Sequence, residues 1–168
     1  DSLAIKDMAG VLTPNVTKKL VQALVKNISL PIHMHCHATS GLATLNLISA
    51  VDAGATTIDT CNSSYSEGAS HPTTESIVVA LDDMGYKTDI DLSKMDEITE
   101  NLKESRKKYW QFESKFTGLD PKVLINQVPG GMISNLSNQL KDQGALDRMS
   151  EVLKEIPELD YGIILDGE

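Results

Sequence analysis

Short apolar runs alternate with amphipathic segments along the first half of the chain. The runs at residues 2–5, 32–37 and 56–60 have the length and the apolar content of buried strands. Each run is followed by a segment with apolar residues at helical spacing. The predicted helices begin at Pro14 and span residues 41–53 and 74–81. Strand and helix repeated at roughly 30-residue spacing are typical of a parallel α/β sheet or barrel.

Residues with known preferences for helix ends support these boundaries. Thr13 suits an N-cap, and Pro14 suits the first helical position, where the missing amide hydrogen costs nothing. Gly54 follows the second predicted helix and suits its C-terminal end. We therefore expect ordinary strand–helix units in this part of the chain.

The second half of the chain is helical in pattern and more charged. Helices are predicted at residues 92–113, 132–143 and 146–155, with a break between the last two at Gly144. We place a domain boundary near Gly85. Residues 1–85 would then form a partial barrel domain, and residues 86–168 a helical extension.

Composition narrows the class of protein. The 168 residues are 40% apolar and only 4% aromatic, so we expect one real core of aliphatic side chains. A net charge of −9 argues against nucleic acid or an anionic membrane surface as a direct partner. Two cysteines, Cys36 and Cys61, do not suggest a disulfide framework.

Targeting signals are not visible in the sequence. No apolar run approaches the roughly 18 residues of a transmembrane helix, and no signal peptide is recognisable. We therefore expect a cytoplasmic protein, with the mitochondrial matrix as an alternative. The first residue is Asp1 rather than Met, which indicates a fragment of a longer chain.

Three side chains at the ends of the predicted strands suggest a metal site. His35 and His37 are two residues apart on a strand, so their rings point to the same side, about 6–7 Å apart along the strand. Such a pair can chelate one divalent cation. Lys6 ends the preceding strand, and its cationic form would repel that metal. The apolar run Leu3–Ile5 just before Lys6 suggests a buried lysine, and burial favours the neutral amine. A neutral amine, or an anionic carbamate formed with CO2, removes the conflict and points to carboxyl transfer.

Neighbouring residues have simpler interpretations. A His-x-His pair can also be an ordinary polar strand end. His33 shares the face of His35 and is expected to be structural, orienting a ligand from behind. Cys36 points the other way and should pack against a helix. Asp7 either orients neighbouring groups or caps the next turn, and Ser40 belongs to a turn held by local side-chain to backbone bonds.

The segments Ile5–Gly10 and His35–Gly41 together resemble the carboxyltransferase domain of biotin-dependent enzymes. That family includes pyruvate carboxylase, the oxaloacetate decarboxylase alpha subunit and the transcarboxylase 5S subunit. The resemblance continues to about Pro157, through Ile58–Thr60, Thr74–Ser76, Gln127–Met132 and Gln139–Ala145. It implies the last three strand–helix units of a TIM barrel, which needs eight strands, followed by the start of a helical extension.

The resemblance also implies a function and a site. Lys6 would be the carboxylated catalytic lysine and a metal ligand, with His35 and His37 as further ligands to zinc, manganese or cobalt. A fourth ligand, an aspartate, would lie upstream. The enzyme would move a carboxyl group between biotin and pyruvate or oxaloacetate. The biotin-bearing Met-Lys-Met signature is absent, so biotin would arrive on another domain or chain. Other expected partners are the remaining barrel segment and further copies in a homo-oligomer.

Two alternatives stay open at this point. Lyases and synthases resembling HMG-CoA lyase share the barrel and the His-x-His pair, but they typically place Asp where this chain has Ala38. At residues 59–63 and 73–75 the chain departs from the usual carboxyltransferase sequence, so the resemblance does not identify one subfamily of carboxyltransferases. A non-catalytic assembly module is the second alternative, because the chain lacks the upstream aspartate. In every case we expect the isolated chain to be inactive.

Overall fold

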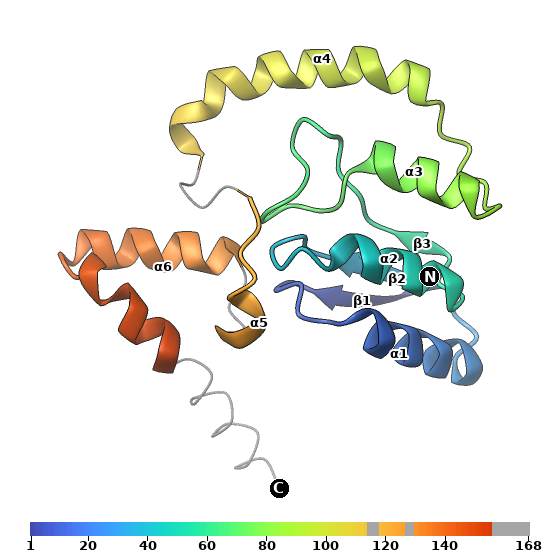
Figure 1. Cartoon of the computed structure of the whole chain (residues 1–168), viewed down its shortest axis with the longest axis horizontal. Helices are drawn as coiled ribbons and strands as arrows, with labels where there is room; N and C mark the ends of the chain where they lie inside the picture. Colours follow the sequence, from blue (N-terminus) through green and yellow to red (C-terminus); the bar gives the residue numbers. More distant parts are fainter. Residues whose placement is uncertain (114–117, 127–129, 156–168) are drawn as a thin grey trace, which may run out of the picture.

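The computed structural model describes residues 1–113, 118–126 and 130–155. Its first half contains a parallel three-stranded sheet in the order β1-β2-β3, with β2 in the middle. Strand and helix alternate as the sequence predicts (Figure 1). The elements, in chain order, are β1 (Leu3–Asp7), α1 (Pro14–Asn27), β2 (Ile32–Cys36), α2 (Ala43–Asp52), β3 (Thr57–Ile58) and α3 (Thr74–Asp83). This confirms the predicted α/β fold with a parallel sheet.

Two strands differ in length from the prediction. β1 runs on to Asp7 rather than ending at residue 5, because its ladder with β2 continues through Asp7 and Cys36. Lys6 therefore lies inside the strand and not just after it. β3 is shorter than residues 56–60, since only Thr57 and Ile58 form the ladder with β2.

One face of the sheet carries the core. Ile32, Met34 and Cys36 of β2 are fully buried beneath α1 and α2. The side chains they meet are aliphatic and small, among them Val21, Leu47 and Ala50. The opposite face is polar, with His33 and His35 half-buried and Lys6 exposed. This division of faces follows from the period-2 alternation of strand side chains.

Helix ends follow the sequence closely. Thr13 is the N-cap residue of α1 with Pro14 next, although the Thr13 hydroxyl makes no capping hydrogen bond. Gly54 follows α2 with φ +109°, a conformation that glycine adopts without strain. The amide of Ala55 then donates to the carbonyl of Ala50 at 2.9 Å, which closes the helix as a Schellman motif.

The second half is helical, as predicted. It consists of α4 (Leu92–Tyr109), η1 (Trp110–Phe112), α5 (Val123–Asn126), α6 (Gly130–Asp142), η2 (Leu146–Arg148) and further helix at 149–155. The predicted helix 92–113 corresponds to α4 with η1, and α6 begins two residues before the predicted start at 132. Residues 127–129 and those beyond 155, Pro157 included, lie outside the described part of the chain.

Polar contacts attach α4 to the loop that follows β3. The hydroxyl of Thr99 accepts from Asn62 at 2.8 Å, and its carbonyl accepts from the Ser64 hydroxyl at 3.0 Å. Arg106 donates to the Ser64 carbonyl at 2.6 Å. Figure 1 shows α4 lying along this loop, across the top of the view. No helix in the described part of the chain combines the length and apolar character that crossing a membrane requires.

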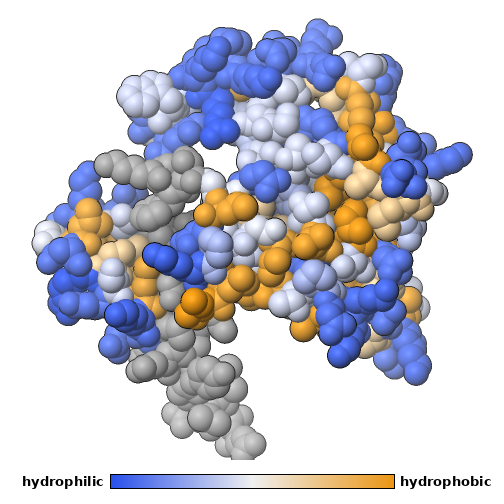
Figure 2. All heavy atoms as spheres, viewed as in Figure 1, coloured by the Kyte–Doolittle hydropathy of each residue, from blue (hydrophilic) through white to orange (hydrophobic). Residues whose placement is uncertain are grey.

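Figure 2 shows a band of apolar residues across the middle of the molecule, between hydrophilic residues on α4 and on α1. Val79 on α3 and Leu45 on α2 are among the exposed apolar side chains, at 58% and 55% exposure. Beside β3 lies an open groove of about 670 Å³, lined by apolar side chains that include Ile58, Ile77 and Tyr86. The sheet therefore has apolar surface in water next to its β3 edge.

Candidate metal centre

The predicted site residues gather at the C-terminal ends of β1 and β2. Lys6 and His35 are direct partners in the parallel ladder, and His37 follows β2 by one residue. Since ladder partners point to the same face, Lys6 stands beside His35 on the polar side of the sheet. Functional groups of α/β barrels gather at this end of the strands.

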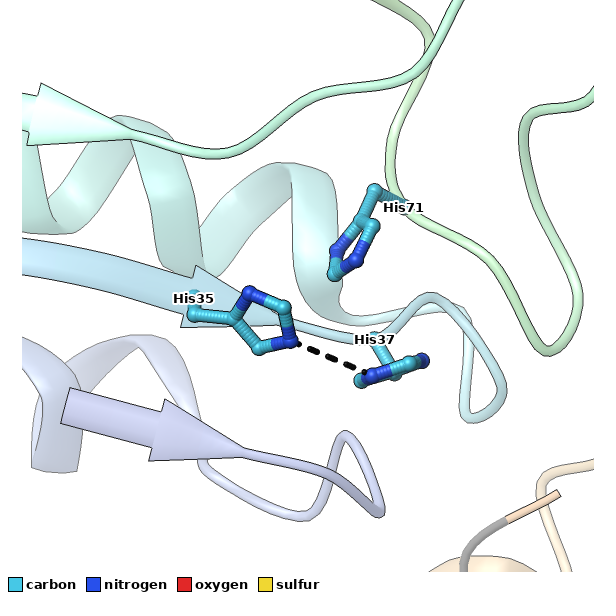
Figure 3. Close-up of side chains that lie close together, drawn as sticks. All are labelled: His35, His37 and His71. Atoms are coloured by element: carbon cyan, nitrogen blue, oxygen red, sulfur yellow. Dashed lines mark hydrogen bonds between the residues drawn. The ribbon is translucent and has the colours of Figure 1, made fainter. Parts of the chain in front are cut away.

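The two predicted histidine ligands face each other. Nε2 of His35 lies 3.3 Å from Nε2 of His37, and the ring centroids are 5.1 Å apart (Figure 3). Two imidazoles bound to one tetrahedral zinc at about 2.0–2.1 Å would have their nitrogens about 3.3–3.4 Å apart. The pair therefore has the separation of two ligands of one ion.

Their hydrogen bonds fix which nitrogens carry protons. Nδ1 of His35 lies 2.6 Å from a carboxylate oxygen of Asp59, and Nδ1 of His37 lies 2.7 Å from the carbonyl oxygen of Ala69. A carbonyl only accepts, and so does an ionised carboxylate. In the neutral rings both protons are thus on Nδ1, and two Nε2 lone pairs face each other. A cation between them would turn that repulsion into attraction.

Asp59 orients one member of the pair, His35, and sequence reasoning did not assign it a role. Besides His35, it accepts from Nε2 of His33 at 2.9 Å. Partial burial raises the pKa of Asp59, but hydrogen bonds from His35 and His33 outweigh burial and hold that pKa below its ordinary value. The carboxylate therefore stays ionised. His33 shares that carboxylate with His35, and its orienting role stays a prediction. A carboxylate at the end of the next parallel strand is the signal that could have revealed it.

His71 is a third imidazole at the site, and sequence reasoning missed it. It comes from the loop between β3 and α3, and its ring centroid lies 4.4 Å from that of His35 and 4.5 Å from that of His37. One ring nitrogen from each of the three lies within 4.8 Å of those of the other two. Figure 3 shows the three rings turned toward one another.

Lys6 differs from the sequence expectation in its burial. An apolar setting was expected to favour its neutral amine, but the side chain is exposed in this structure. The reason is topological. β1 is an edge strand of the three-stranded sheet, so on one side Lys6 has no neighbouring strand among the described residues. Burial of Lys6 would need structure beyond these residues.

The remaining candidates have structural roles. Both carboxylate oxygens of the buried Asp7 accept backbone amides, from Val11 at 3.0 Å and Leu12 at 2.9 Å, so Asp7 caps the turn. Cys36 is fully buried on the opposite face, as predicted, where burial and then Asp7 raise the pKa of its thiol to about 12. The Ser40 hydroxyl donates to the Gly10 carbonyl and accepts from the Leu42 amide, which agrees with a turn role.

Two family profiles match the chain in succession. The HMGL-like family matches residues 2–102, and the family described as a conserved carboxylase domain (PYC_OADA) matches residues 123–162. The first match covers the sheet, its helices and most of α4. The second begins at α5 and continues through α6.

Individual relatives agree with these profiles. A pyruvate carboxylase subunit of Methanocaldococcus jannaschii is 49% identical over 94% of this chain, which spans 28% of that relative. The methylmalonyl-CoA carboxyltransferase 5S subunit of Propionibacterium freudenreichii is 40% identical over 94% of this chain, which spans 31% of that subunit.

A solved structure gives the same result for the fold. The carboxyl transferase domain of Rhizobium etli pyruvate carboxylase with pyruvate superposes on 92% of this chain with a TM-score of 0.87 at 34% identity, and 26% of that chain is covered. The sheet, its helices and the helical extension therefore match in order. The chain belongs to the HMGL-like family, and its relatives are the carboxyltransferases of biotin-dependent enzymes.

Proposed function

We propose that this chain forms part of a carboxyltransferase domain that moves a carboxyl group between biotin and pyruvate or oxaloacetate. The observation that carries the proposal is the pair of Nε2 atoms of His35 and His37, 3.3 Å apart with both Nδ1 atoms engaged. Lys6 stands next to them as the ladder partner of His35. Two imidazoles beside one lysine are the metal ligands that the resemblance to the carboxyltransferases implies.

Lys6, His35 and His37 would hold a divalent metal ion. Imidazole nitrogens suit zinc, and a site with oxygen donors also suits manganese or cobalt. The neutral amine of Lys6 would add to CO2, lose a proton and become a carbamate anion, whose oxygen then serves as a ligand. When bound, the metal supplies Lewis acidity toward the keto oxygen of the substrate and toward the enolate that follows.

The chain's own residues prepare this site. Asp59 keeps the proton of His35 on Nδ1, and the Ala69 carbonyl does the same for His37. Both ligand atoms are therefore presented before binding, which avoids a cost of reorganisation. Biotin would be carried by another domain or chain and would meet the substrate at the polar face of the sheet.

Further strands would complete the barrel on both sides of the sheet. β1 and β3 are its edges, and an unpaired edge is a hazard unless it is covered. The apolar groove beside β3 supports a neighbouring element there. The rest of the barrel, the biotin carrier and a homo-oligomer are therefore proposed partners. The boundary at residue 85 and the cytoplasmic or matrix location stay predictions.

The carboxyltransferase is favoured over the two alternatives. The match to the conserved carboxylase domain at residues 123–162 supports it against a lyase of the same barrel type. The preorganised lone pairs of His35 and His37 support a catalytic site against an assembly module.

The test uses the intact carboxyltransferase, meaning this chain with the rest of its barrel. Metal content and oxaloacetate decarboxylation are measured for the wild type and for His35→Ala. His33→Gln is the matched control, because it removes a histidine from the same face and keeps a donor for Asp59. We expect His35→Ala to lose both metal and activity while His33→Gln retains metal. Equal metal content in wild type and His35→Ala would reject the proposal.

A further inference from the structure

His71 is held at the metal centre by its own loop. Its Nδ1 lies 2.9 Å from the carbonyl oxygen of Cys36, the last residue of β2. The carbonyl of His71 accepts from the Glu67 amide at 2.8 Å, and that of the next residue, Pro72, accepts from the Cys61 amide at 2.9 Å. The backbone at His71 is therefore held by hydrogen bonds within the loop, and the His71 ring is held by its hydrogen bond to β2.

The hydrogen bond to Cys36 determines the protonation of the ring. A carbonyl oxygen only accepts, so Nδ1 of His71 carries the proton and Nε2 carries a lone pair in the neutral form. Among the described residues, Nε2 of His71 has no hydrogen-bond partner. His35 and His37 show the same arrangement, with Nδ1 bound to an acceptor in each case.

Three imidazoles thus share one design. Each donates from Nδ1 to a fixed oxygen, and each therefore has a lone pair on Nε2 in the neutral form. One ring nitrogen from each histidine lies within 4.8 Å of those of the other two. Metal-binding histidines characteristically donate their other ring N–H to a carboxylate or a carbonyl. A histidine that only fills space would not need its proton on the same ring nitrogen as its two neighbours.

We propose that His71 is a third imidazole ligand of the metal centre, an inference that rests on the metal site proposed above. The donors from this chain would then be three imidazole nitrogens and a carbamate oxygen from Lys6, beside the aspartate that the resemblance places upstream. Because the third nitrogen comes from the β3–α3 loop, the metal would tie that loop to the end of β2. Metal removal should then loosen the loop as well as empty the site.

The experiment measures metal affinity rather than turnover, in the intact carboxyltransferase. Zinc and cobalt affinities are obtained by chelator competition for wild type, His71→Ala, His71→Phe and His35→Ala. The visible absorption of the cobalt form reports the donor set directly. His71→Phe keeps a flat ring in the cluster and removes both nitrogens, so it separates ligation from packing.

We expect both His71 variants to bind metal more weakly by well over ~100-fold, which is beyond the range for residues that only orient a ligand. Their cobalt spectra should shift, and free imidazole should restore the wild-type spectrum in His71→Ala. Wild-type affinity and spectrum in His71→Phe would overturn the ligand role. If His35→Ala lost metal while both His71 variants kept it, the proposed function would stand and this inference would fall. A wild type without metal affinity would reject both.

Discussion

A carboxylate oxygen of Asp59 lies 2.6 Å from Nδ1 of His35, while its other oxygen lies 2.9 Å from Nε2 of His33. One carboxylate at the end of β3 thus fixes the ring of His35 on β2, a histidine of the proposed metal site. Because the bond uses Nδ1, the free electron pair of His35 is on Nε2, toward His37. The tautomer of His35 is set by a neighbouring strand and not by its own.

Replacing Asp59 should weaken the metal site without emptying it. Asp59→Asn keeps the shape but leaves one oxygen acceptor for two histidine donors. We expect metal affinity to fall by about 10–100-fold, the range for residues that orient a metal ligand. Chelator competition on the intact carboxyltransferase measures it. Asp52→Asn, an exposed carboxylate paired with Lys18 on the helical face, is the control. Unchanged affinity in Asp59→Asn would remove Asp59 from the site.

Lys6→Arg should abolish carboxyl transfer while leaving the fold intact. Arginine keeps the positive charge and cannot form a carbamate, and its charge would oppose metal binding next to His35. The exposure of Lys6 in this chain means that the substitution removes no core contact. Pyruvate-dependent decarboxylation of carboxybiotin is measured beside the melting temperature. Near-normal turnover in Lys6→Arg would reject the carbamate role.

The sequence predicted that His35 and His37 lie together because the two histidines are two residues apart at the end of one strand. Period 2 alone puts His35 and His37 on one side, and Lys6 follows from the end of the neighbouring strand. His71 could not be found this way. It reaches the site because its loop returns to β2, where the Ser70 carbonyl accepts from the Ala38 amide at 2.8 Å. The spacing of residues along the sequence does not predict that this loop contacts the end of β2.

Burial was harder to predict than position. Lys6 was expected in an apolar setting because Leu3, Ala4 and Ile5 precede it, but those residues alternate between the two faces. In a whole barrel, the burial of this polar face depends on strands that are distant in the sequence. The local pattern therefore predicted the strand, but it could not predict what covers the polar face of that strand.

Gly10 should resist substitution more strongly than another glycine of similar backbone conformation. It has φ +67°, and a Cβ there would collide with the carbonyl oxygen of His37. Gly85 has φ +87° and open space around it, so Gly85→Ala reports the conformational cost alone. We expect Gly10→Ala to destabilise by about 1–3 kcal/mol and by more than Gly85→Ala. Thermal unfolding of the intact carboxyltransferase compares them, and equal losses would contradict the collision.

Glu75 links α3 to the loop that holds α4, and its carboxylate accepts several hydrogen bonds. The amide of Ser63 donates at 3.1 Å and its hydroxyl at 2.6 Å, and the Thr99 hydroxyl donates at 3.3 Å. Partial burial raises the pKa of Glu75, but these hydrogen bonds, that from the Ser63 hydroxyl foremost, outweigh burial and hold the pKa below its ordinary value. Folding is therefore coupled to ionisation of this carboxyl.

Stability should consequently depend on pH through Glu75. Because the folded pKa lies below the unfolded one, the stabilisation is full above the unfolded value and is lost as pH falls through the folded value. Glu75→Gln should cost on the order of 1 kcal/mol near neutral pH. Between about pH 6 and pH 3 its stability should approach that of the wild type. Glu104→Gln, on an exposed i,i+3 pair with Lys107, is the control. A Glu75→Gln deficit that stays constant with pH would show that the hydrogen bonds do not require the charge.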